Sequence, residues 1–87
     1  MGNDETAVVA HPYVAKSPDV QGGQACVKGT RMTVASLWAR YDLHGQSPRE
    51  IAAQFPHLSL ARILDALSYA AEHEEEMRRD LEADNDG

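Results

Sequence analysis

The fold is decided by the stretch SPREIAAQFPHLSLARILDAL, residues 47–67. Ser47 is suited to cap a helix, Pro48 stands at the first helical position, and Glu50 completes a capping box. A turn that contains a proline then leads to Ser59, which is suited to cap a second helix. Two short helices, each with its own cap and joined by a tight turn, predict a helix-turn-helix unit.

Apolar spacing sets the bounds of three helices, which we predict at about 34–44, 48–55 and 60–73. Thr33 caps the first of them and Gly45 ends it. The apolar stripe of the first helix consists of Val34, Leu37, Trp38 and Tyr41. The stripe of the third consists of Leu60, Ile63, Leu64, Leu67, Ala70 and Ala71. We expect both stripes to face the core, with the two aromatic rings there or at a dimer contact.

Before the first helix, short β-branched pieces alternate with turn residues, which predicts two or three short strands and a β-hairpin over 8–31. The pieces are Val8-Val9, Tyr13-Val14 and Cys26-Val27. A structural role in the turns is assigned to Gly23, Gly29, Thr30 and Arg31. We expect a positive φ at Gly29, and we expect Arg31 to tie loop carbonyls or a carboxylate together.

The predicted fold class is mainly α with a small N-terminal β-hairpin. It is a helix-turn-helix or winged-helix-like three-helix domain over 8–73, with an extended acidic C-terminal helix. Residues 1–7 are expected to be disordered, because they are polar or small and show no apolar period.

The net charge of −6 belongs to the acidic C-terminal arm, residues 72–87. Acidic and basic residues balance over residues 1–71, whereas the arm carries eight carboxylates and two arginines. We expect the arm to continue the third helix as a projecting, solvated rod in which Met77 and Leu81 keep the apolar stripe. It is either a solvated face or an arm that fits a basic groove on a partner protein. Its candidate partner-binding residues are Glu72, Glu75, Glu76, Arg78 and Arg79.

Composition narrows the function classes. A chain of 87 residues forms one small domain that buries only about 60% of its unfolded surface, so a homodimer is expected. Its single cysteine, Cys26, excludes an internal disulfide and a cysteine zinc site, and fits a reducing cytosol. The chain shows neither a signal peptide nor an apolar run near the roughly 20 residues of a membrane span, so we expect a cytoplasmic protein without membrane contact.

Catalysis and metal binding find no support in the sequence. The four histidines lack metal-ligand spacing, and no nucleophile with its base or pair of carboxylates can be identified. We therefore expect no enzyme activity, no metal and no cofactor.

The helix-turn-helix unit offers few cations for DNA. The candidate DNA-binding residues are Arg49 for a phosphate, and Ser59 and Arg62 at the start of the third helix for base edges. Because DNA binding usually needs several phosphate-neutralising cations, the unit is favoured as a packing or dimerisation scaffold, with DNA contact as the alternative.

Four separated blocks of the chain resemble a bacterial family known as domain of unknown function 433. The blocks are Gly22 to Val34, Gly45 to Ile51, Phe55 to Ser59 and Ile63 to Ala70, and the resemblance covers about residues 13–73. The chain departs from the family pattern at Ala25, where a proline is usual, and at Ala61-Arg62, where an acidic pair is frequent.

The resemblance implies a small, commonly dimeric helix-turn-helix fold with an N-terminal hairpin, and a role like that of VapB-type antitoxins. We therefore expect the antitoxin of a type II toxin-antitoxin module, which binds and neutralises a PIN-like ribonuclease toxin, with promoter DNA as a second partner. The alternative is a stand-alone helix-turn-helix regulator of transcription.

Overall fold

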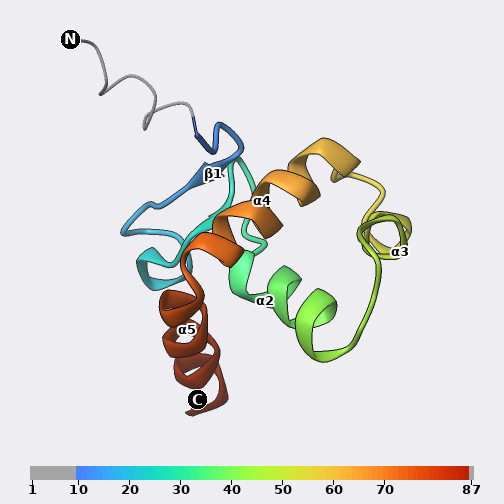
Figure 1. Ribbon diagram of the computed structural model, residues 1–87. Helices are drawn as coiled ribbons and strands as arrows, with labels where there is room; N and C mark the ends of the chain where they lie inside the picture. The colour runs from blue at the N-terminus through green and yellow to red at the C-terminus, as the bar shows by residue number, and fades with distance from the viewer. Residues whose placement is uncertain (1–9, 87) are drawn as a thin grey trace, which may run out of the picture.

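The computed structural model describes residues 10–86 (Figure 1), so the expected tail over 1–7 and the Val8-Val9 strand lie outside the described residues. In chain order the elements are β1 (Val14–Ala15), the 3-10 turn η1 (Gln21–Gly23), β2 (Cys26–Val27), α2 (Val34–Trp38), the π turn η2 (Ala39–Leu43), α3 (Pro48–Gln54), α4 (Leu60–Glu72) and α5 (Glu74–Asp86). This order confirms the mainly helical fold class with a small N-terminal hairpin.

The hairpin is held by its turn residues. β1 and β2 pair antiparallel, with Val14 opposite Val27. Gly29 has a φ of 81°, which confirms the predicted positive value. The Thr30 hydroxyl donates to the carbonyl of Val27 at 2.8 Å and accepts the N–H of Met32 at 3.1 Å. These bonds fix the turn that leads from the hairpin into α2.

The predicted helix caps are all present. Thr33 accepts the N–H of the third residue of α2 at 3.1 Å. Ser47 and Glu50 form both bonds of the capping box at the start of α3, and Ser59 caps α4 through the N–H of Arg62. Each cap satisfies backbone donors that a helix end leaves open, which is why these three boundaries follow from local sequence.

The first helix differs from the prediction after Trp38. The N–H of His44 donates to the carbonyl of Ala39 at 3.1 Å, five residues back, which makes the last turn a π turn. A π turn takes in one extra residue and so moves the following side chains off the apolar stripe. Tyr41 lies within this turn and is 43% exposed, whereas Trp38 packs partly against the core.

The core gathers side chains from β2, α2, α3, α4 and α5. Its largest fully buried members are Leu37, Ile51, Ile63, Met77, Val27 and Val34. Leu58, from the turn between α3 and α4, is buried as well. Leu64 departs from the predicted stripe because it is 47% exposed beside Pro48 and Arg49.

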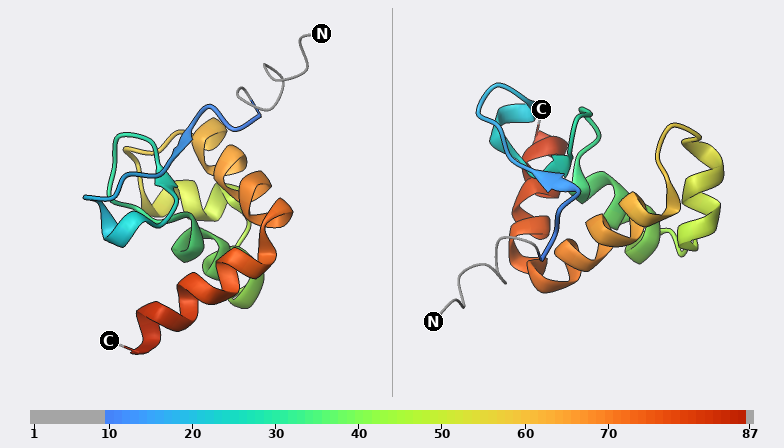
Figure 2. Two further views of the ribbon diagram at one scale, coloured as in Figure 1. Left: turned by 90° about the vertical axis from the view of Figure 1, so that its left-hand side faces the viewer. Right: turned by 90° about the horizontal axis from the view of Figure 1, so that it is seen from above.

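The acidic arm is not a projecting rod, so that prediction was wrong. α4 ends at Glu72, and His73 leaves helical geometry with φ −132° and ψ 50°. α5 then turns sharply away from α4 (Figure 1) and packs against α2. The apolar side chains of the arm explain the turn, because Met77 is 1% exposed in the core and Leu81 packs against it. α5 and α3 end up on opposite sides of the molecule (Figure 2).

Candidate binding surfaces

An apolar groove with an acidic rim lies between α5 and the end of the first helix, and we name it the α5 groove. Its apolar lining is Trp38, Leu43 and Leu81. Its charged lining is Asp42, Glu74, Glu75, Arg78 and Glu82. Leu43 is 68% exposed although it is a large apolar side chain. The groove therefore offers exposed apolar surface inside a rim of net negative charge.

Arg78 compensates only part of that rim. Its guanidinium bonds Glu75, and its Nη1 lies 3.1 Å from Oε2 of Glu82. Within residues 10–86, neither Asp42 nor Glu74 has an ion-pair partner. Arg79, the other predicted cation of the arm, is exposed on α5.

Glu72 is turned away from the α5 groove and holds the start of the described chain. The ring of His11 bridges two carboxylates, with Nε2 2.7 Å from Glu72 and Nδ1 3.1 Å from Asp65. The second oxygen of Asp65 accepts the N–H of Tyr13 at 2.8 Å. Burial disfavours the charged ring, but the bonds to Glu72 and Asp65 outweigh it and raise the pKa of His11. We call His11, Asp65 and Glu72 the histidine clamp.

Glu76 also makes internal contacts. Its carboxylate accepts the hydroxyl of Tyr69 at 3.0 Å and lies 3.0 Å from Nζ of Lys16. The bond to Glu76 raises the pKa of Lys16, and burial together with Glu76 raises the pKa of Tyr69. The arm residues predicted to bind a partner are thus divided, because Glu75 and Arg78 line the groove while Glu72 and Glu76 tie α4 and α5 to the N-terminal segment.

Two of the three residues predicted to bind DNA are joined, because the Ser59 hydroxyl accepts the N–H of Arg62, whereas Arg49 lies on α3. Arg49 is exposed at the start of α3, beside a hollow formed with Leu60 and Leu64. The Ser59 hydroxyl is engaged as the cap of α4. Arg62 is half-buried, lies 5.4 Å from the ring of Tyr13, and donates to the carbonyl of Lys28 at 3.4 Å. Among the described residues, Arg49 is therefore the one of the three whose side chain makes no hydrogen bond or ring contact.

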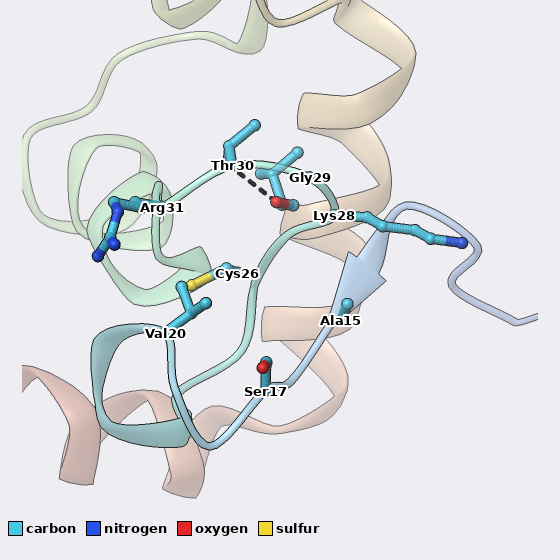
Figure 3. A pocket seen from close by; sticks show the side chains of 9 residues that line it. Ala15, Ser17, Val20, Cys26, Lys28, Gly29, Thr30 and Arg31 are labelled. Atoms are coloured by element: carbon cyan, nitrogen blue, oxygen red, sulfur yellow. Dashed lines mark hydrogen bonds between the residues drawn. The ribbon is translucent and has the colours of Figure 1, made fainter.

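The hairpin turn borders a second hollow, shown in Figure 3. It is lined by Ala15, Ser17, Val20, Cys26, Val27, Lys28, Gly29, Thr30 and Arg31. Burial raises the pKa of the Cys26 thiol against the opposing charge of Arg31, and the thiol points to the carbonyl of Gln24 at 3.5 Å. A buried thiol of this kind packs as a small apolar side chain.

Among the described residues, the Arg31 guanidinium does not make the tie that the sequence predicts, and the contact of this residue runs through its main chain instead. Its carbonyl accepts Nε2 of Gln21 at 3.0 Å. Within the described residues, the guanidinium itself has no hydrogen bond or ion pair. Gly23, with φ 88°, closes the neighbouring turn. Lys28 and Arg31 extend to opposite sides of the hairpin turn (Figure 3), so both cations face outward.

Among residues 10–86, no three His, Cys, Asp or Glu side chains are grouped as a metal site would require. In that same part of the chain, no helix has the length and apolar character needed to cross a membrane.

Sequence reasoning missed several members of the α5 groove. The sequence does not mark Asp42 and Leu43, because they come before the acidic arm. Glu74 and Glu82 belong to the acidic arm, but the sequence does not distinguish them from its other carboxylates. A signal existed at Leu43, which lies outside the stripe of Val34, Leu37 and Trp38 and so had no predicted place in the core.

The fold and these surfaces define a class of small, mainly helical domains that carry a two-stranded N-terminal hairpin and a separate C-terminal helix. Within that class, the chain belongs to the family described as protein of unknown function (DUF433), whose model matches residues 14–70. A crystal structure of a member of this family from Anabaena variabilis is similar, with a TM-score of 0.69 and 29% sequence identity. The similarity covers 87% of this chain and 73% of that one. None of the curated proteins matches the chain.

Proposed function

We propose that this protein is a non-catalytic, cytoplasmic antitoxin of a type II toxin-antitoxin module, which binds and neutralises a PIN-like ribonuclease. The observation that carries the proposal is the fixed acidic face of α5. Met77 and Leu81 hold this helix against the body, while Glu74, Glu75 and Glu82 are exposed.

A fixed acidic face suits a ribonuclease as partner for two physical reasons. A cleft that holds RNA attracts a polyanion, so carboxylates of matching placement are drawn to the same field. Because α5 is already folded and packed, binding orders fewer side chains than binding by a free tail would.

Because VapB-type antitoxins are encoded beside their toxins, the proposal is tested by expressing the protein together with the product of the neighbouring gene. We expect the two proteins to copurify and the neighbour to cleave RNA when it is isolated. Copurification should weaken at high salt, because the screening length of exposed charges falls from about 10 Å at 0.1 M salt to about 3 Å at 1 M. A neighbour that is no nuclease and does not copurify would refute the antitoxin role.

A stand-alone regulator of transcription is the second candidate, favoured by the cations that have no carboxylate partner within the described residues. Lys28 and Arg31 flank the hairpin turn, Arg62 donates to the carbonyl of Lys28, and Arg49 is exposed at the start of α3. For this candidate we expect salt-dependent binding to promoter DNA that Arg62→Ala weakens. Binding that is absent or insensitive to salt would exclude it.

We further propose that the protein acts as a homodimer, since a domain of this size leaves much of its surface exposed. Sedimentation or light scattering on the purified chain should give twice the mass of 9.5 kDa. A monomer at micromolar concentration would contradict the proposal.

A further inference from the structure

We propose that the α5 groove holds a segment of a partner protein in which one apolar side chain is flanked by lysine or arginine residues. The inference rests on the proposed function, because it identifies the surface of the antitoxin that meets its target and the chemistry of the segment that fits there.

The exposure of Leu43 is the reason why we expect an apolar side chain in the partner segment. This residue is 68% exposed, and Trp38 and Leu81 continue the apolar surface into the groove. Both of these are half-buried, so they still present part of their surface there. An apolar side chain placed among the three would remove that surface from water, and well-packed central anchors of this kind dominate the binding energy of interfaces.

The acidic rim of the α5 groove is the reason why we expect basic residues in the partner segment. Four carboxylates surround the apolar lining, and the guanidinium of Arg78 serves Glu75 and Glu82 but not Asp42 or Glu74. Asp42 comes from the end of the first helix and Glu74 from the start of α5. Basic residues on either side of the apolar anchor would meet a carboxylate on each wall of the groove.

The groove exists before any partner arrives. One wall is the π turn η2, which carries Asp42 and Leu43 outward, and Trp38 and Tyr41 support it with ring centroids 5.6 Å apart. The other wall is α5, anchored by Met77 in the core. A groove with walls already in place loses little conformational freedom on binding.

The charge of the rim also decides against a second copy of this chain as the occupant. A twofold symmetric contact places the same surface patch of each copy opposite its equal. At the α5 groove this would set two acidic rims against each other, and like charges across an interface oppose association. A basic segment from a different protein meets no such repulsion.

The test measures the affinity of the full chain for the purified product of the neighbouring gene. One of the two proteins is immobilised on a sensor surface, and binding is followed at low and at physiological salt. Leu43→Ser should weaken the complex by about tenfold or more, mainly through faster dissociation. Asp42→Asn together with Glu74→Gln should slow association several-fold, and the deficit should shrink as salt rises.

Matched controls are available in the same chain. Leu64→Ser changes another exposed leucine, which lies on α4 beside α3, and Asp19→Asn changes an exposed carboxylate of the hairpin. Both should leave the affinity within about twofold of the native protein. Thermal unfolding of every variant separates loss of binding from loss of folding.

Each outcome decides the inference. If the complex forms and the groove variants bind as tightly as the controls, the groove assignment is overturned while the proposed antitoxin function stands. If no complex forms at all, both fall. If Leu43→Ser converts a dimer into a monomer and leaves the affinity for the nuclease unchanged, the α5 groove is occupied by a second copy of the chain and the inference is overturned.

Discussion

A single residue, Met77, fixes the position of α5. Its side chain is 1% exposed near the start of a helix whose residues are mostly polar. We predict that Met77→Ala lowers the free energy of unfolding by about 2–5 kcal/mol, the usual cost of truncating a buried methionine to alanine. Urea unfolding measures it, with Arg79→Ala on the exposed side of the same helix expected to change stability by less than about 0.5 kcal/mol. Equal effects of the two substitutions would mean that α5 does not depend on the core.

Gly29 tests the hairpin turn on backbone grounds alone. Its φ is 81°, and a Cβ added there would meet no atom within 4 Å. We therefore predict that Gly29→Ala costs about 1–2 kcal/mol from backbone strain, and that Gly29→Asn costs less, because asparagine tolerates the left-handed region better. Chemical denaturation of the two variants compares them, and a neutral alanine variant would contradict the assigned geometry.

Single residues also show which features were predictable from sequence. Ser47, Glu50 and Ser59 act through bonds to backbone three residues away, so the caps and the starts of α3 and α4 could be predicted. The break at His73 could not, because no glycine or proline marks it and it serves the burial of Met77. The contacts of His11 lie 54 and 61 residues away in the chain, beyond any local pattern.

At the scale of elements, the histidine clamp joins the N-terminal segment to α4 and makes this contact sensitive to pH. The pKa of His11 is raised above its ordinary value of 6.5. The charged His11 ring therefore stabilises the folded protein fully below pH 6.5. This contribution is lost as the pH rises through the higher pKa that His11 has in the folded state. We predict that the stability advantage of the native protein over His11→Gln shrinks steadily as the pH is raised from about 6 to about 9.

Denaturant unfolding over this pH range provides the measurement, together with an NMR titration of the His11 ring. His57→Gln serves as the control, because His57 is exposed and, among the described residues, has no carboxylate partner. An advantage of the native protein over His11→Gln that grows with pH would show that the ring is held neutral and that the clamp is wrongly assigned.

In the whole molecule, the fold gives the acidic arm a side of its own. α5, on which Glu74, Glu75 and Glu82 are exposed, and α3 lie on opposite sides (Figure 2). The groove could be anticipated only in part, because the acidic run is plain in the sequence whereas its second wall, Asp42 and Leu43, is brought to α5 by packing. This packing gives the acidic arm a fixed shape, so under the proposed function the arm would recognise its partner by shape as well as by charge.

The most direct test of the antitoxin role is the RNA-cleaving activity of the neighbouring gene's product, titrated with this protein. Full inhibition at an equimolar ratio, relieved by Leu43→Ser but not by Leu64→Ser, is the predicted result. A nuclease that stays fully active with excess native protein present would contradict the account.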